Sequence, residues 1–433
     1  SLVATLVACP NGGGGGADTS VDGDAADAAD GLPPRTYLMG GRAEAIGPTL
    51  GSPESFSLEA WGEVGRVDAI VLPLDLFGVP WDAFVGGADN LPAELPADWL
   101  LNLEMVKDAL VALDAQLAAE AEAAEEEPMD YEVILSLSPV TRDGVYLSPG
   151  TMDTTGKTPD WERCFDPAAE SDPTRYPGRY AGYVAYLVKE FAPDMVILGM
   201  TMNRYEENCG QAIYEAMIGV TNAAHERLQL LDEPPMTILE VDVEDLYGYP
   251  KKAGRCVAVT PEVCFEERRA LLEPIVADAV GLHSQPAIAL EEIDAIPQDW
   301  LERVAEAAPT EETVITATSL PATDLFKQDP ATGPCIGILQ SDEVEQRSWL
   351  DQVLSTVAAR EMALVVWDPI QDHMPQDVAA SCPCDGDTDI CYYLEHVGLD
   401  RATATRRLVT GGLWGHDGTS RLSGMVWDEE RAR

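Results

Sequence analysis

The chain has 433 residues, with 27 basic against 76 acidic side chains and a formal net charge of −49. This balance argues against nucleic acid as a partner, because phosphate binding needs clustered Lys and Arg. The acidic residues are spread over predicted helices as well as loops, which is typical of a highly hydrated, soluble surface.

The first residues have the form of a bacterial lipoprotein processing site. Leu6-Val7-Ala8-Cys9 follows a short apolar stretch, and a Gly-, Ala- and Asp-rich segment comes next. That segment cannot bury enough apolar surface to fold. We therefore expect residues 1–9 to end a signal peptide with lipidation at Cys9, residues 10–34 to be a flexible tether, and residues 35–433 to form the folded domain. A chance match in an Ala-rich chain is the alternative.

This reading places the protein outside the cytoplasm. Lipid on Cys9 holds a protein at the cell surface or outer membrane without a spanning helix, and no later stretch is long and apolar enough to span a membrane. The predicted membrane contact is therefore the lipid anchor alone. An extracellular location is the other expectation.

Eight short apolar runs cross the chain, each followed by a helical stretch. The runs are rich in Val, Ile, Leu and Met, as in strands buried on both faces. They cover residues 36–40, 69–74, 132–137, 195–202, 236–241, 279–282, 313–316 and 363–367, and helical periodicity is clear in 99–125, 180–191 and 341–361. Eight strand–helix units in alternation predict an α/β fold, a (β/α)8 TIM barrel. A doubly wound open sheet is the alternative, but no Gly-rich phosphate turn follows an early strand.

Eight cysteines remain once Cys9 is set aside, an even number that fits an oxidising compartment. They are Cys164, Cys209, Cys256, Cys264, Cys335, Cys382, Cys384 and Cys391. Each falls after a predicted strand and at or before the next helix, so we expect long βα loops braced by disulfides at one rim. Neighbouring strands suggest Cys164 with Cys209, a local Cys256–Cys264 pair, and two bridges among the last four. A zinc site at Cys382, Cys384 and Cys391 is the rival, although C-x-C-x6-C lacks the paired spacing of structural zinc sites.

Several strand ends carry recognisable motifs. The second run leads into Gly78-Val79-Pro80-Trp81, residues 278–286 read D-A-V-G-L-H-S-Q-P, and residues 412–427 begin G-L-W-G-H-D-G and end in Trp. In these motifs the chain resembles bacterial glycosidase-like barrels related to clan A glycoside hydrolases, over about residues 35–427. The resemblance implies a sugar cleft at the carboxyl ends of the strands. Its expected wall residues are Asp75, Trp81, Arg142, Asn203, His283, Trp367, Asp368 and Asp372.

The match fails at the catalytic positions. Retaining hydrolysis needs two carboxyls about 5 to 5.5 Å apart. The family pattern has its acid two residues after the glycine that ends strand four, where this chain has Thr201. It has its nucleophile after strand seven, in a form like I-A-E-T-G-W-P, where this chain has Ala317. Neither side chain can do that work.

Substitute carboxylates exist near these strand ends. Glu206 and Glu207 follow strand four, while Glu240, Asp242 and Glu244 alternate along strand five and are expected to lean to one side. A pair drawn from them would form a relocated acid/base site. Acidic loop residues in a very acidic protein are the other interpretation.

Metal and histidine candidates are few. Asp385, Asp387 and Asp389 alternate like the opening of a calcium loop, but the loop lacks Gly at its sixth place and has His396 at its twelfth. Calcium is thus the one cofactor candidate, with a hydrated loop as the alternative. His283 and His373 stand at strand ends six and eight, where a polar wall role is expected rather than a base.

The sequence favours an exported, surface-tethered barrel that binds carbohydrate without the standard catalytic pair. An active hydrolase with relocated carboxylates and a purely structural surface protein are the alternatives. An enzyme needs two carboxyls facing each other across the barrel mouth, and a binder needs exposed aromatic side chains there. A structural protein would have its mouth plugged by the disulfide-braced loops.

Overall fold

The computed structural model describes residues 34–42, 66–85, 94–125, 130–141, 144–148, 163–249, 256, 259–287, 298–323, 325–328, 335–339, 341–372, 411–415 and 417–433. Several predictions fall outside these residues. They are the Cys9 anchor and its tether, Arg142, His373, the calcium-like 385–389 segment, and Cys382, Cys384 and Cys391.

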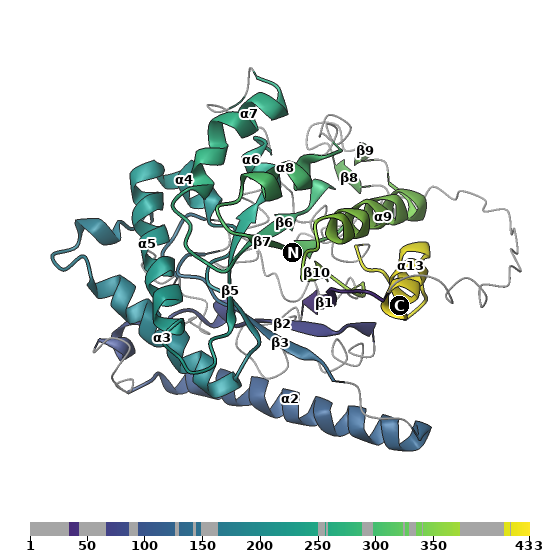
Figure 1. Cartoon of the computed structure of the whole chain (residues 1–433), viewed down its shortest axis with the longest axis horizontal. Helices are drawn as coiled ribbons and strands as arrows, with labels where there is room; N and C mark the ends of the chain where they lie inside the picture. Colours follow the sequence, from purple (N-terminus) through teal and green to yellow (C-terminus); the bar gives the residue numbers. More distant parts are fainter. Residues whose placement is uncertain are drawn as a thin grey trace, which may run out of the picture.

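Parallel strands close into a barrel in the order β1-β10-β7-β6-β5-β4-β3-β2 (Figure 1). The strands are β1 (Leu38–Arg42), β2 (Ala69–Pro73), β3 (Glu132–Ser136), β4 (Met195–Ile197), β5 (Met236–Asp242), β6 (Ala279–Ser284), β7 (Glu312–Thr318) and β10 (Leu364–Trp367). Each predicted apolar run corresponds to one of them. The predicted (β/α)8 barrel is confirmed, and closure excludes the open sheet.

Helices surround the barrel, and short elements fill the segments that follow its strands. The long helices are α2 (Ala97–Ala124), α3 (Arg175–Phe191), α5 (Gln211–Leu228), α8 (Trp300–Ala307), α9 (Glu343–Ala359) and the C-terminal α13 (Leu422–Arg431). The short elements are η5 (Leu74–Phe77), η6 (Trp81–Phe84), η7 (Pro167–Ala169), α4 (Asn203–Cys209), α6 (Val243–Leu246), α7 (Pro261–Arg268), η8 (Arg269–Leu272) and the hairpin β8 (Leu325–Gln328) with β9 (Cys335–Leu339). The sequence did not predict this hairpin.

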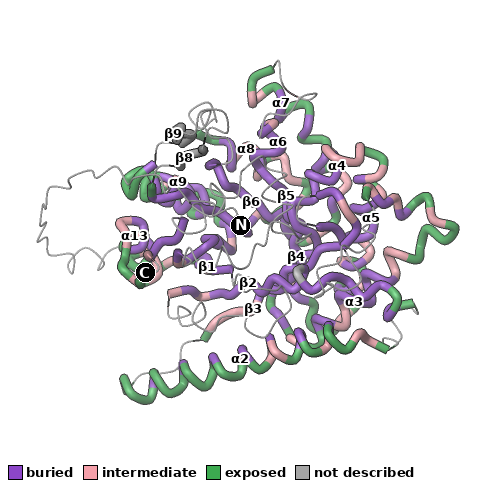
Figure 2. The backbone as a smooth tube through the Cα atoms, turned by 180° about the vertical axis from the view of Figure 1, so that it is seen from behind, coloured by how far each residue is buried: buried purple, intermediate pink, exposed green. Residues whose placement is uncertain are grey.

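Two apolar layers hold the barrel. Small and medium side chains such as Ala69, Ile134 and Val366 fill its interior, while larger ones such as Leu72 and Leu282 pack outward against the helices. Figure 2 shows the barrel strands buried and much of α2 exposed. This arrangement follows from the period-two alternation of side chains along each strand.

The fourth strand is shorter than predicted. It ends at Ile197 rather than at Met202, although the apolar sequence continues. Thr201 adopts the left-handed region with φ 44°, so the backbone leaves the extended conformation there. The Tyr180 hydroxyl donates to the Leu198 carbonyl at 2.8 Å, which satisfies a backbone group that the sheet no longer pairs.

Three aspartates fasten neighbouring strands at the amino end of the barrel. Asp68, Asp194 and Asp278 each stand directly before an even-numbered strand. Their side chains accept from the backbone N–H groups of the second residue of the preceding strand: from Met39 at 2.9 Å, from Val133 at 3.4 Å and from Thr237 at 2.8 Å. Each aspartate N–H also donates back to the carbonyl of that same residue. The units β1–β2, β3–β4 and β5–β6 are thus closed by the same reciprocal contact.

Two predicted disulfides are present in the described rim. Cys164 bridges Cys209 with a Cα–Cα distance of 5.1 Å, and Cys256 bridges Cys264 at 5.4 Å. Cys209 lies at the end of the short helix α4 and Cys264 lies within α7, each between one barrel strand and the next. The disulfides therefore brace folded segments. No helix in the described ranges has the length and apolarity needed to cross a membrane.

Candidate functional site

Thr201 and Ala317 are both buried at the carboxyl end of the barrel. A bulge in the pairing of β6 with β7 sets Ala317 opposite His283. Thr201 is a β-branched residue held at φ 44°, a conformation that costs such residues energy and that is common at functional sites. Neither position carries a carboxylate, so the expected acid and nucleophile are missing from their places.

A buried charged layer crosses the barrel just below these positions. The Arg42 Nη2 donates to Glu240 Oε2 at 3.3 Å and to the Thr316 carbonyl at 3.4 Å. Its Nε lies 3.7 Å from Asp368 Oδ2, and His283 Nδ1 lies 3.2 Å from Glu240 Oε1. Because Thr316 directly precedes Ala317, the guanidinium lies beside the expected position of the nucleophile.

Glu240 is held ionised in this layer. Burial alone would raise its pKa, but the charge and hydrogen bond of His283 and the charge of Arg42 outweigh it and lower the pKa from 4.5 to about 2. A carboxyl with this pKa cannot donate a proton near neutral pH. It serves as the counter-ion of Arg42.

The same layer retains unused hydrogen-bonding capacity. His283 Nδ1 faces the Glu240 carboxylate and is therefore assigned a proton. Among the described residues, His283 Nε2 and the Ser136 hydroxyl have no hydrogen-bond partner although both are buried. Buried polar atoms of this kind are normally satisfied by water or by ligand hydroxyl groups.

A second network uses Asp242 and Asn203. Arg204 Nε donates to Asp242 Oδ2 at 2.8 Å, and Asp242 Oδ1 accepts from the Asp245 N–H at 2.6 Å. The Asn203 amide donates to Asp245 Oδ2 at 2.6 Å and to the Asp242 carbonyl at 2.9 Å. The prediction that Glu244 continues strand five is wrong, because Asp242 ends the strand and caps α6, in which Glu244 lies.

The two candidates on α4 differ in their surroundings. Glu206 is buried and pairs with Arg268, whose Nη1 lies 3.3 Å from Glu206 Oε2. Arg268 also pairs with Asp245 at 2.6 Å. Glu207 is half-buried on the same helix. Glu206 and Asp242 are therefore each matched by an arginine within the rim.

The pKa of Glu244 is shifted in the opposite direction from that of Glu240. Burial, followed by the charge of Asp242, raises the pKa of Glu244 well above its usual value. The Ser284 hydroxyl donates to Glu244 Oε1 at 3.0 Å, and Oε2 has no hydrogen-bond partner among the described residues. Two carboxyls whose surroundings push their pKa values apart are a pattern that acid/base catalysis uses.

The predicted aromatic wall residues are buried. Trp81 is 7% exposed, its Nε1 donates to the Ser148 carbonyl at 2.8 Å, and its ring centroid lies 5.3 Å from that of Tyr176. Trp367 has no exposed surface, belongs to the outer apolar layer, and donates from Nε1 to the Gly411 carbonyl at 2.9 Å.

The remaining polar wall residues are also enclosed. Asp75, Asn203, His283 and Asp368 are all less than a tenth exposed. Asp372 pairs with Arg421 and accepts from the Gly412 N–H at 2.9 Å. None of the predicted wall residues in the described ranges therefore presents an open face.

Sequence reasoning missed Arg42. The available signal was an arginine at the end of an apolar run, directly after Gly40 and Gly41. A cation that ends a buried strand needs a buried partner. That partner is Glu240, 198 residues away in the chain.

No protein-family model matches the sequence, and no curated protein matches it. Solved structures do. The exo-β-1,4-mannosidase of Opitutaceae bacterium strain TAV5 is 14% identical over 92% of this chain and 60% of its own, with a TM-score of 0.47. The chain thus spans less than two thirds of that relative's length.

Two further structures cover most of their own length. Fungal β-1,4-galactanases are 12% identical over 86% of this chain and 90% of theirs, with a TM-score of 0.43. An intracellular xylanase of Thermoanaerobacterium saccharolyticum is 10% identical over 90% of this chain and 95% of its own, with a TM-score of 0.45. The chain is similar to these enzymes, as its motifs suggest. Likenesses of this size do not assign an activity.

Proposed function

We propose that the protein is an exported carbohydrate-binding barrel that does not cleave glycosides by the two-glutamate route. The observation that carries the proposal is the pair Thr201 and Ala317 at the expected catalytic positions. Losing the acid and the nucleophile together removes most of the transition-state stabilisation on which such hydrolysis depends. Glu240 does not replace the acid, because its pKa lies near 2.

Binding without chemistry is supported by polar groups inside the barrel and not by the expected aromatic side chains, since Trp81 and Trp367 are both buried. The Ser136 hydroxyl, which can both donate and accept, and the His283 Nε2 atom have no hydrogen-bond partner among the described residues. Hydroxyl groups of a neutral sugar both donate and accept, so they complement this set. The motifs around Trp81 and residues 278–286 support the same ligand class by resemblance.

Export is supported by the disulfides and by the start of the sequence. The bridges Cys164–Cys209 and Cys256–Cys264 fit an oxidising compartment. We propose that Cys9 carries the lipid that holds the barrel at a membrane surface. A full-length precursor expressed in bacteria should partition with membranes, and Cys9→Ser should release it. Equal partitioning of the two forms would contradict the anchor.

A hydrolase with relocated carboxylates is the second candidate. The observation that favours it is that the pKa of Glu240 on β5 is lowered while that of Glu244, four residues later on α6, is raised. In that reading Glu244 donates the proton and Glu240 acts as base or nucleophile.

One experiment separates the candidates. Purified protein is screened for turnover on polysaccharides and aryl glycosides, and for saccharide binding by calorimetry. The proposal expects binding without turnover, and a weakening of about two- to tenfold on Ser136→Ala, the usual effect of one hydrogen bond. Ser284→Ala is the matched control, since that hydroxyl is occupied by Glu244.

Two outcomes would contradict the proposal. Turnover that disappears on Glu244→Gln would establish the relocated hydrolase. Absence of binding to every saccharide tested would favour a structural surface protein.

A further inference from the structure

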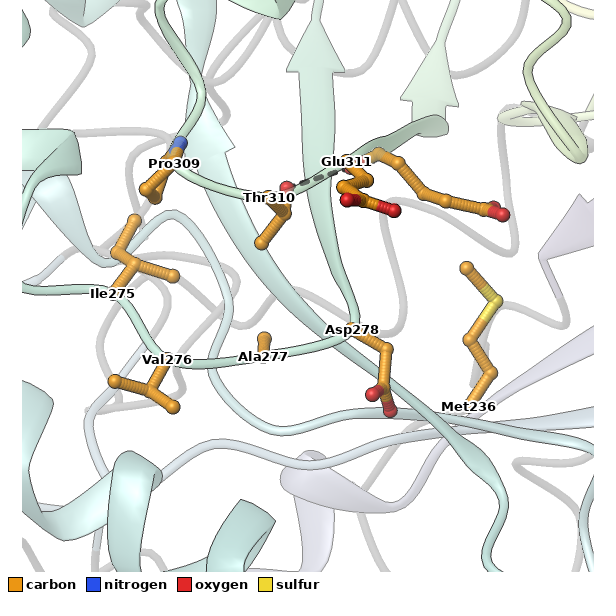
Figure 3. Close-up of a pocket in the computed structure, with 9 residues that line it drawn as sticks. Met236, Ile275, Val276, Ala277, Asp278, Pro309, Thr310 and Glu311 are labelled. Atoms are coloured by element: carbon orange, nitrogen blue, oxygen red, sulfur yellow. Dashed lines mark hydrogen bonds between the residues drawn. The ribbon is translucent and has the colours of Figure 1, made fainter.

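An open groove of about 550 Å³ lies at the opposite end of the barrel from Thr201 and Ala317. It is formed where the chain enters β5, β6 and β7, by Met236, residues 275–278 and residues 309–312. Figure 3 shows Pro309, Thr310 and Glu311 on one side and Ile275, Val276, Ala277 and Asp278 on the other. Its volume falls in the range of about 300 to 1,000 Å³ that is usual for ligand pockets.

The groove has an apolar wall. Met236, Ile275, Val276, Ala277 and Pro309 contribute to it, and the Val276 side chain is exposed, with 46% of its surface open to solvent. Exposed apolar side chains gathered in one hollow are a common mark of an interaction site. The opposite segment is fixed, because the Thr310 hydroxyl donates to the Glu312 carbonyl at 2.7 Å.

All charged side chains in the groove lining are acidic. Asp278, Glu311 and Glu312 line it and are exposed, and the lining contains no Lys, Arg or His. Within the described residues, none of the three carboxylates is in an ion pair with a basic side chain. Asp278 is held in place by the Thr237 N–H and hydroxyl, both at 2.8 Å.

The spacing of the three carboxylates bears on the kind of cation that fits the groove. The described residues hold no group of three or more His, Cys, Asp or Glu side chains arranged for a metal ion. The carboxylates are spread along the groove and complement an extended cation better than a point charge.

We propose that this groove docks a cationic, apolar segment of a partner protein. A Lys or Arg of the partner lies against Asp278, Glu311 and Glu312, and a neighbouring apolar side chain covers Val276. The inference is independent of the proposed saccharide site, because the two lie at opposite ends of the barrel. It assigns the amino end of the barrel to protein contact and leaves the mouth free.

The test uses the full chain and three labelled synthetic peptides, measured by fluorescence anisotropy. One peptide alternates Leu and Lys, the second has Ser in place of Leu, and the third has Glu in place of Lys. The Leu–Lys peptide should bind most tightly, and its affinity should fall at about 0.5 M salt, where exposed charges are screened.

Variants locate the binding. Glu311→Gln and Glu312→Gln should each weaken the Leu–Lys peptide about two- to fivefold, which is the range of an exposed ion pair. Val276→Ser should weaken it as well, while Glu120→Gln with Glu122→Gln, exposed on α2, should leave it unchanged. All these positions are exposed, so circular dichroism should show an unaltered fold.

Three outcomes would overturn the inference. Equal affinity for the Leu–Lys and Ser–Lys peptides would mean that the apolar wall contributes nothing and that the peptides are held only by the overall net charge of −49. Equal weakening by the α2 control would do the same. Binding of spermine with the same affinity and the same sensitivity to Glu311→Gln would assign the groove to a small cation instead.

Discussion

Replacing Glu240 by Gln tests the charged layer inside the barrel. The change nearly preserves volume but removes the charge that Arg42 and His283 face. The pKa of Glu240 falls from 4.5 to about 2 on folding, and each tenfold change in proton affinity is worth about 1.36 kcal/mol. The ionised carboxylate thus contributes on the order of 3 kcal/mol, a value close to the 3–5 kcal/mol typical for breaking a buried pair.

The pH dependence has a definite sign. Because the pKa of Glu240 is lowered in the folded state, its contribution is complete above pH 4.5 and is lost as pH falls toward 2. We expect Glu240→Gln to cost about 3 kcal/mol of unfolding free energy at neutral pH, and roughly half of that near pH 3, from the same two-state titration. Urea unfolding followed by the fluorescence of the nine tryptophans measures both values.

A surface pair provides the control. Glu190 pairs with Lys107 between α3 and α2, and both side chains are about a third exposed. Glu190→Gln should cost less than about 1 kcal/mol at either pH, because exposed pairs contribute little. An equal cost for the two variants, or a Glu240→Gln cost that does not change with pH, would refute the buried-layer argument.

Further predictions concern the scaffold. Removing the Cys164–Cys209 bridge by Ser substitutions should cost about 4 kcal/mol and removing Cys256–Cys264 about 2.5 kcal/mol, from loop entropies for separations of 45 and 8 residues; thermal unfolding that reverses this order would contradict the estimate. Asp278→Ala should cost about 1–3 kcal/mol in urea unfolding because it leaves the Thr237 N–H without its carboxylate, whereas exposed Glu311→Ala should change stability by less than about 0.5 kcal/mol. Gln346→Leu should cost at least about 2 kcal/mol by the same measurement, since its amide donates to the Leu320 carbonyl at 2.8 Å and to the Gly412 carbonyl at 3.1 Å.

The fold could be predicted from the sequence because each barrel strand is a short run of consecutive apolar residues. Near-continuous apolar runs such as 236–241 and 363–367 match β5 and β10 to within one residue. The end of β4 was not readable, since Met200 and Met202 continue the apolar pattern after the backbone has turned at Thr201. A left-handed φ cannot be predicted from a threonine in the sequence, because β-branched residues rarely adopt that conformation.

The site was only partly readable, because its contacts join distant strands. The prediction that Glu240 and Asp242 share one side of β5 agrees with their register against Gly281 and His283 on β6. The sequence did not reveal that Arg42 neutralises Glu240, since pairing across a closed barrel depends on strand order and tilt. Buried core packing was an equal alternative for Trp367 in the sequence, and the structure has that residue buried; the burial of Trp81 was not predicted, because the sequence does not show which way an aromatic residue in the segment after a strand faces.

The reciprocal aspartate contacts determine where the barrel should accept new chain termini. Asp68, Asp194 and Asp278 each tie an even strand to the strand before it, but no such aspartate precedes β10, where Ala363 stands. A circular permutation that opens the chain between β2 and β3 or between β4 and β5 leaves every tied pair on one continuous segment. Opening it between β5 and β6 separates Thr237 from Asp278 along the chain, so that contact has to form between the two ends of the polypeptide. New termini should therefore be accepted more readily between the pairs than within them.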